Sequence, residues 1–159
     1  MRALLLIVGA TLLLGGPALA DDYSADAYAT CSACHLPDGV GVPGAFPPVR
    51  NRAARIAALE GGREYLVAVV SYGLMGTIEV EGNQYFGVMA GLGAAMSPSQ
   101  VAAALNYIVF KLNDGEVLEV PRFTADEVEK AQAAVSMKSP AGAGELRKSL
   151  VARHGDRWP

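Results

Sequence analysis

Apolar residues recur at helical spacing in two segments near the start of the chain. Segment 24–34 is rich in alanine, the strongest helix former, and places Tyr28 on one face with the residue three positions later. Segment 63–72 has an apolar face and is followed by Gly73, a residue typical of helix C-termini. Both segments are therefore predicted to be α-helices.

Capping residues mark the beginnings of two further helices. Ser97 is a preferred N-cap and Gln100 completes a capping box, so a helix is expected from there through Phe110. Thr124 and Glu127 repeat the same pattern after a linker at residues 116–121. A fourth helix is therefore predicted to begin at the threonine.

Three other stretches depart from strong helical periodicity. Segment 36–51 is dense in proline and glycine, which predicts a rigid irregular loop. Residues 77–80 and 84–86, separated by Glu-Gly-Asn, resemble a small hairpin. Residues 145–151 look weakly helical after two interrupting glycines. Helices dominate the pattern, which predicts an all-α fold of about three to five helices with a C-terminal helical extension.

Residues 1–20 have the pattern of a secretory signal peptide. A basic end at Arg2 precedes an apolar run over 3–14, and small residues lead to an expected cleavage site after Ala20. The apolar run is too short to span a hydrocarbon core, so no stable membrane insertion is expected once it is removed. The sequence therefore predicts a periplasmic protein whose mature chain begins at Asp21.

Charge and composition narrow the range of functions. The chain has 13 Lys and Arg against 16 Asp and Glu, a net charge of −3, so nucleic acid is not an expected partner. No phosphate-binding glycine motif, metalloprotease helix or Gly-x-Ser-x-Gly elbow occurs. We expect one domain over 21–114 and a linker with a helical extension over 115–159.

Cys31-Ser32-Ala33-Cys34-His35 is the motif that carries chemistry. Two thiols and an imidazole in the order C-x-x-C-H are what covalent haem attachment requires, because the thiols add to the vinyl groups and the histidine reaches the iron. Export fits this chemistry, since c-type haem is attached after translocation. The motif therefore predicts one covalent haem c with its iron, and His35 as the proximal ligand.

Three other interpretations compete for these cysteines. A zinc site needs about four ligands, yet the chain has only two cysteines and His154 is its only other histidine. A thioredoxin-like redox pair would normally open a helix, whereas here a helical segment precedes the motif. A structural disulfide is the third possibility. Haem attachment is the interpretation favoured by the residues.

Two more residues are candidates for the same site. A proline carbonyl in loop 36–51 can accept the Nδ1 proton of His35, and Pro47 is the expected acceptor. Met89 is the best candidate for a sixth iron ligand, because it lies in a non-helical run whose glycines allow close approach to a flat cofactor. Met75, Met96 and Met137 remain alternatives, as does iron without a sixth protein ligand; Met96 is expected to pack as a hydrophobic staple before the Ser97 cap.

With these features the chain resembles the class I mono-haem c-type cytochromes, the small soluble bacterial kind. The resemblance rests on Cys-Ser-Ala-Cys-His, Gly-Val-Pro-Gly-Ala-Phe-Pro-Pro, Arg-Glu-Tyr-Leu, Tyr-x-Gly-Val-Met and Leu-Asn-Tyr-Ile. It implies helices wrapped around one haem, thioethers at Cys31 and Cys34, axial His35 and Met89, and a supporting carbonyl at Pro47. It also implies that the first and last helices cross, which would bring Tyr28 near Tyr107. Members usually have proline where this chain has Ala90 and glycine where it has Asn51.

The expected function is one-electron transfer in the periplasm, and not catalysis. A dehydrogenase would be the donor and an oxidase-type protein the acceptor, with weak docking at the exposed haem edge. One alternative is the dedicated haem subunit of a periplasmic dehydrogenase complex, held by the C-terminal extension. Another is a five-coordinate haem protein that binds a small gas or activates peroxide.

Overall fold

The structure is a computed structural model that describes residues 25–115, 119–135 and 138–159. The expected signal peptide, its cleavage site and Met137 lie outside the described residues. Among the described residues, no helix combines the length and the apolar character needed to cross a membrane.

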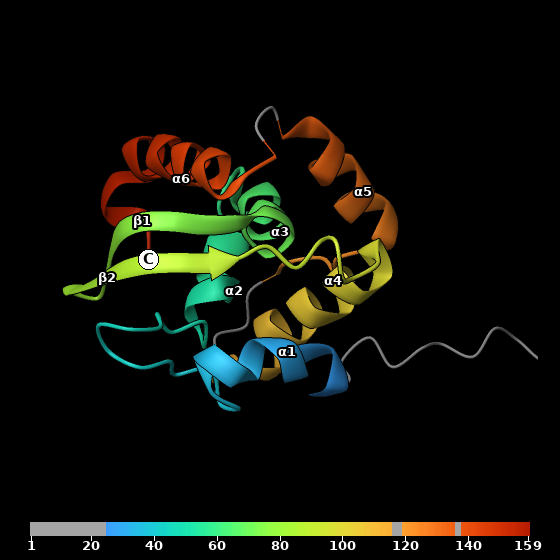
Figure 1. Cartoon of the computed structure of the whole chain (residues 1–159), viewed down its shortest axis with the longest axis horizontal. Coiled ribbons are helices and arrows are strands. Elements are labelled where there is room, and N and C mark those ends of the chain that lie inside the picture. Colours follow the sequence, from blue (N-terminus) through green and yellow to red (C-terminus); the bar gives the residue numbers. More distant parts are fainter. Residues whose placement is uncertain (1–24, 116–118, 136–137) are drawn as a thin grey trace, which may run out of the picture.

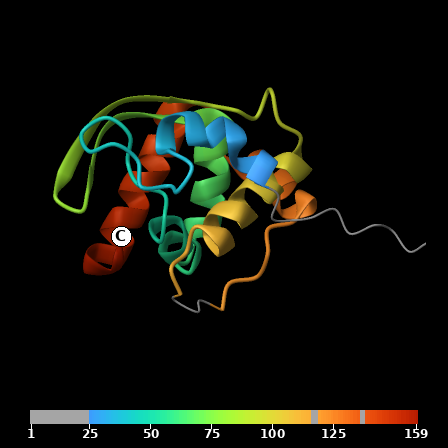
Figure 2. The same cartoon turned by 90° about the horizontal axis from the view of Figure 1, so that it is seen from below.

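The first helix packs against the helix that ends the predicted first domain, as the resemblance implied. Helix α1 (Ala25–His35) contacts α4 (Pro98–Asn106) and the π-helix η1 (Tyr107–Lys111) that continues it (Figures 1 and 2). The rings of Tyr28 and Tyr107 stack with centroids 5.3 Å apart and planes 19° from parallel. The Tyr28 hydroxyl also donates to the Leu36 carbonyl at 2.9 Å. Tyr28 is thus a core residue that fixes the helix crossing.

Helix α3 (Gly62–Tyr72) lies at the centre of the helical part, because it contacts α2, α4, α5 and α6. It ends at Gly73 as predicted, where φ is 83°. The short helix α2 (Arg52–Ala57) was not predicted from sequence. Four of its six residues are buried small or apolar side chains, so α2 is stabilised by packing and not by a capping signal.

A two-stranded antiparallel sheet corrects the all-α expectation. Strands β1 (Gly73–Val80) and β2 (Asn83–Ala90) form the expected hairpin, but they are longer than the sequence indicated and include Met89. Alternation places Leu74 and Met89, which are paired, on the more buried face. The exposed face carries Met75, Phe86 and Val88.

The C-terminal part folds back onto the rest of the chain. Helix α5 (Ala125–Ala134) packs against α3 and α4, and α6 (Pro140–His154) packs against β1 and α3 before the 3-10 turn η2 (Gly155–Arg157) (Figure 1). The prediction that glycines interrupt α6 was wrong. Helix α6 runs without a break through both glycines; Gly142 is buried, and a Cβ added at Gly144 would lie 3.6 Å from the Met75 carbonyl oxygen, an ordinary contact distance.

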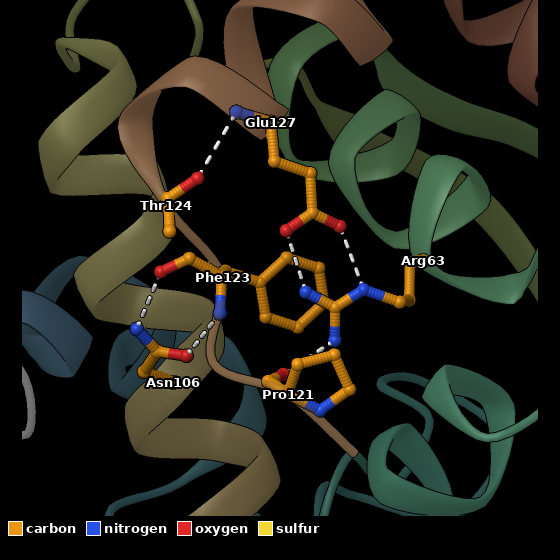
Figure 3. A network of polar contacts seen from close by, with 6 residues as sticks. All are labelled: Arg63, Asn106, Pro121, Phe123, Thr124 and Glu127. Atoms are coloured by element: carbon orange, nitrogen blue, oxygen red, sulfur yellow. Dashed lines mark hydrogen bonds and ion pairs between the residues drawn. The ribbon is translucent and has the colours of Figure 1, made fainter.

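A polar network fastens the start of α5 to α3 and α4 (Figure 3). The Arg63 guanidinium makes two bonds of 2.6 Å to the Glu127 carboxylate and lies 3.8 Å over the Phe123 ring. Asn106 donates to the Phe123 carbonyl and accepts from its backbone N–H. Thr124 caps the helix as predicted, by accepting from the Glu127 backbone N–H, but the Glu127 carboxylate binds Arg63 and does not close a capping box.

Candidate functional site

The cysteines and the histidine lie together at the C-terminal end of α1. Cys31 is 7% exposed, Cys34 is exposed and the two thiols are not joined in a disulfide. Because they are three residues apart on a helix, both project from one face with His35 beside them. This arrangement presents two thiols and one imidazole to a single ligand.

The local environment disfavours the competing interpretations of the motif. Burial raises the pKa of the Cys31 thiol, and a helix C-terminus further disfavours a thiolate, whereas redox pairs need a lowered pKa. Within the described ranges, no group of three or more His, Cys, Asp and Glu side chains could hold a metal ion, which leaves zinc short of ligands.

His35 is held in one orientation by the loop that follows α1. Its ring is 8% exposed, and its Nδ1 lies 2.8 Å from the Pro47 carbonyl oxygen, the partner expected from sequence. Since a carbonyl only accepts, Nδ1 must carry the proton. Burial is the main cause that lowers the pKa of His35, which favours the neutral form of the ring. Nε2 is thereby left with a lone pair for a metal ion.

The position of the Pro47 carbonyl depends on a glycine. Gly41 has φ of 66°, a left-handed conformation that favours glycine, and its N–H donates to the His35 carbonyl at 3.0 Å. A Cβ at Gly41 would lie 2.8 Å from the Pro47 oxygen. A side chain there would therefore push away the acceptor of the histidine proton.

The far end of the loop is fastened by Asn51, at the position where the resemblance implied glycine. Asn51 has φ of 58°, a backbone angle that glycine adopts more readily than other residues. Its Oδ1 accepts from the Asp114 backbone N–H at 2.7 Å and its Nδ2 donates to the Asp114 carboxylate at 3.1 Å. Arg50 donates to the same carboxylate, and the hydrogen bonds from Arg50 and Asn51 lower the pKa of Asp114. Asparagine thus combines a tolerated left-handed backbone with a side-chain clasp.

Two replacements of Asn51 separate the effect of its backbone conformation from the effect of its side-chain hydrogen bonds. Asn51→Gly and Asn51→Ala both remove the side-chain hydrogen bonds to Asp114, but alanine keeps a Cβ at a φ of 58° whereas glycine does not. The alanine variant should be less stable than the glycine variant by about 1 kcal/mol. Urea unfolding of both haem-loaded variants measures the difference; equal stability would show that the backbone at this position is not strained.

The methionines occupy different environments. Met89 is partly buried on the inner face of the hairpin, while Met75 is exposed on the opposite face. Met96 packs against the main core cluster beside the α4 cap, as a staple residue would. Met89 comes from a separate element and shares no hydrogen bond with the α1 residues in the described structure.

Sequence analysis missed one group of residues near this site. Arg52, Arg147 and Trp158 each bury a nitrogen that has no hydrogen-bond partner. They are far apart in sequence and belong to no motif, so only the tertiary structure reveals them.

The C-x-x-C-H motif ends α1, the histidine donates to a proline carbonyl, and α1 packs against α4 and η1. This combination is typical of a c-type cytochrome. No family model matches the chain. It is 48% identical over 125 residues to a cytochrome c-552 of Thermus thermophilus, covering 78% of this chain and 84% of that protein. A second cytochrome c-552 of the same species is 47% identical over 107 residues, covering 67% of this chain and 81% of that protein.

The chain therefore belongs to the cytochrome c family. It is an electron-transfer protein and not an enzyme, and it carries one covalently bound haem c with its iron. The residues present fit that cofactor, because two unpaired thiols and a neutral imidazole with a free Nε2 are grouped at one helix end.

Proposed function

We propose that the chain is an exported one-electron carrier with histidine and methionine as axial ligands. Cys31 and Cys34 would hold the haem through thioethers, His35 Nε2 and Met89 Sδ would bind the iron, and the Pro47 carbonyl would orient the histidine. The bound haem supplies reversible one-electron chemistry at its iron. The observation that carries the proposal is the 2.8 Å contact between His35 Nδ1 and Pro47 O beside two free thiols.

Each protein group has a defined task in this proposal. The hydrogen bond from His35 Nδ1 makes the imidazole more basic and keeps its orientation in both oxidation states. A thioether ligand and the apolar core around α1 disfavour the extra positive charge of ferric iron, so they raise the reduction potential. His35 and Met89 would neither make nor break a covalent bond while the electron is transferred, so the structural reorganisation around the iron would be small.

We further propose a periplasmic location, with cleavage after Ala20, and transient docking where Cys34 is exposed at the surface. The donor would be a dehydrogenase and the acceptor an oxidase-type protein. Helix α6 supports a free carrier over a dedicated subunit of a dehydrogenase complex, because it packs against β1 and α3 of its own chain.

The far-red absorption of the ferric protein tests the axial ligation. A thioether bound to ferric iron gives a weak charge-transfer band, which should be present in the intact protein and lost in Met89→Ala. Met75→Ala is the matched control, since Met75 lies on the opposite face of the same hairpin and is 50% exposed. A band that persists in Met89→Ala, or high-spin iron in the intact protein, would contradict the proposal.

A further inference from the structure

Three hydrogen-bond donors near the C-terminal end of the described chain are buried without an acceptor. They are Arg52 Nη2 on α2, Arg147 Nε on α6 and Trp158 Nε1 after η2. Buried donors without partners are rare, because each has lost its hydrogen bonds to water and gained none in return. Three in one region indicate that an acceptor belongs there.

The three residues form one cluster. Arg52 Nε donates to the backbone oxygen of Pro159 at 3.2 Å, which places it next to Trp158. The Arg147 guanidinium lies 5.9 Å from the centre of the Trp158 ring. That ring meets the buried ring of Tyr65 edge-on at 5.4 Å. The donors therefore converge from three separate elements.

The cluster has an excess of positive charge. Arg52 is only 7% exposed, and among the described residues no ion pair joins Arg52 or Arg147 to an Asp or Glu side chain. Burial is the main cause that lowers the pKa of Arg52, and the nearby Arg147 lowers it further. Two guanidinium groups and an indole N–H match a carboxylate, which has two acceptor oxygens and a negative charge.

The cluster also lies beside the candidate haem ligand. Arg52 is the first residue of α2, which begins directly after the loop that carries the Pro47 carbonyl, the hydrogen-bond partner of His35. Arg147 Nη2 donates to the Glu79 carbonyl at 3.0 Å, so the cluster reaches the hairpin that carries Met89. Haem carries two propionate carboxylates, so a haem held by α1 would supply the anionic acceptor that these donors lack.

We propose that Arg52, Arg147 and Trp158 form a binding site for a haem propionate, and that the C-terminal helix α6 and the tail after it complete this site. The inference rests on haem being held at Cys31, Cys34 and His35 as proposed above. It assigns the segment beyond residue 114 to the cofactor site, because two of its three donors come from that segment. The haem-binding unit then extends to Trp158 and does not end at residue 114.

Full-length holoprotein with 13C-labelled propionate carboxyl groups allows a direct test. The label enters through δ-aminolevulinic acid, and infrared difference spectra between oxidised and reduced protein then report the two propionates. We expect a shift of a labelled carboxylate band in Arg147→Gln and in Trp158→Phe, which removes the indole N–H and keeps a smaller aromatic ring. The reduction potential should fall in Arg147→Gln, because a nearby positive charge favours the reduced haem.

Arg153→Gln is the matched control. Arg153 lies on the same helix, and its guanidinium reaches Glu60 at the surface, so its loss should leave the labelled bands unchanged. Arg147→Lys keeps the positive charge but lacks the Nε donor. Its reduction potential should fall less than that of Arg147→Gln, and a labelled carboxylate band should still shift. Labelled bands identical to those of the intact protein in Arg147→Gln and Trp158→Phe would overturn the inference. A failure of the Met89 ligation would be recognised separately, from the far-red band.

Discussion

Replacing both Cys31 and Cys34 with alanine is expected to leave the chain without covalently bound haem. In the structure the two thiols project from one face of α1 and neither is used in a disulfide, so both are available for thioether formation. Acidified organic solvent should extract all haem from the double variant and none from the intact protein. Because a haem held at this site would add apolar surface to the core of a small domain, the double variant should also lose most of its cooperative thermal unfolding.

Ser32→Ala provides the control for this change. Ser32 lies between the two cysteines on α1, and its hydroxyl donates to the Ala29 carbonyl within the same helix. Its loss should leave haem attachment complete. Single replacements of Cys31 and Cys34 should each retain one covalent link. Haem that resists extraction from the double variant would show that the attachment site has been assigned to the wrong residues.

Replacing Asn106 with alanine should lower the free energy of unfolding by about 2–4 kcal/mol. Asn106 is 1% exposed and satisfies both the N–H and the carbonyl of Phe123, at 2.8 and 3.0 Å (Figure 3). Alanine would leave two buried backbone groups without partners and a cavity beside them. The expected result is an early loss of α5 docking, measured by urea unfolding of the haem-loaded protein.

Asn83→Ala is the matched control for Asn106→Ala. Asn83 is the exposed first residue of β2, next to the hairpin turn, and its side chain donates to the Glu81 carbonyl at 3.2 Å. Since solvent can replace that bond, the free energy of unfolding should change by less than about 0.5 kcal/mol. If the two alanine variants were equally stable, the Asn106 contacts would not hold the segment before α5 in solution.

Local signals in the sequence were sufficient for several parts of the structure. The Ser97 capping box, the end of α3 at Gly73 and the Thr124 cap follow from hydrogen bonds between residues a few positions apart. The hydrogen bond between His35 and the Pro47 carbonyl could be predicted for a related reason. The proline-rich loop follows the histidine directly, so its carbonyl groups are close to the imidazole ring along the chain.

The elements that sequence analysis missed depend on distant partners. Helix α2 has no capping signal and is stabilised by burial, and β2 extends as far as Met89 only because β1 lies beside it. Helix α6 continues through its glycines, and the helix as a whole packs against β1 and α3. Neither local propensity nor periodicity carries information about such partners.

By itself, the sequence determined the chemistry of this protein. The C-x-x-C-H motif indicates haem c, because the two thiols and the imidazole that this cofactor needs lie within five residues of the chain. The tertiary structure alone decided what surrounds that motif. Arg52, Arg147 and Trp158 are widely separated in sequence, and they converge only because α6 folds back onto the hairpin and α3. Burial and convergence are properties of the packed chain, so the surroundings of the cofactor could be identified only from the fold.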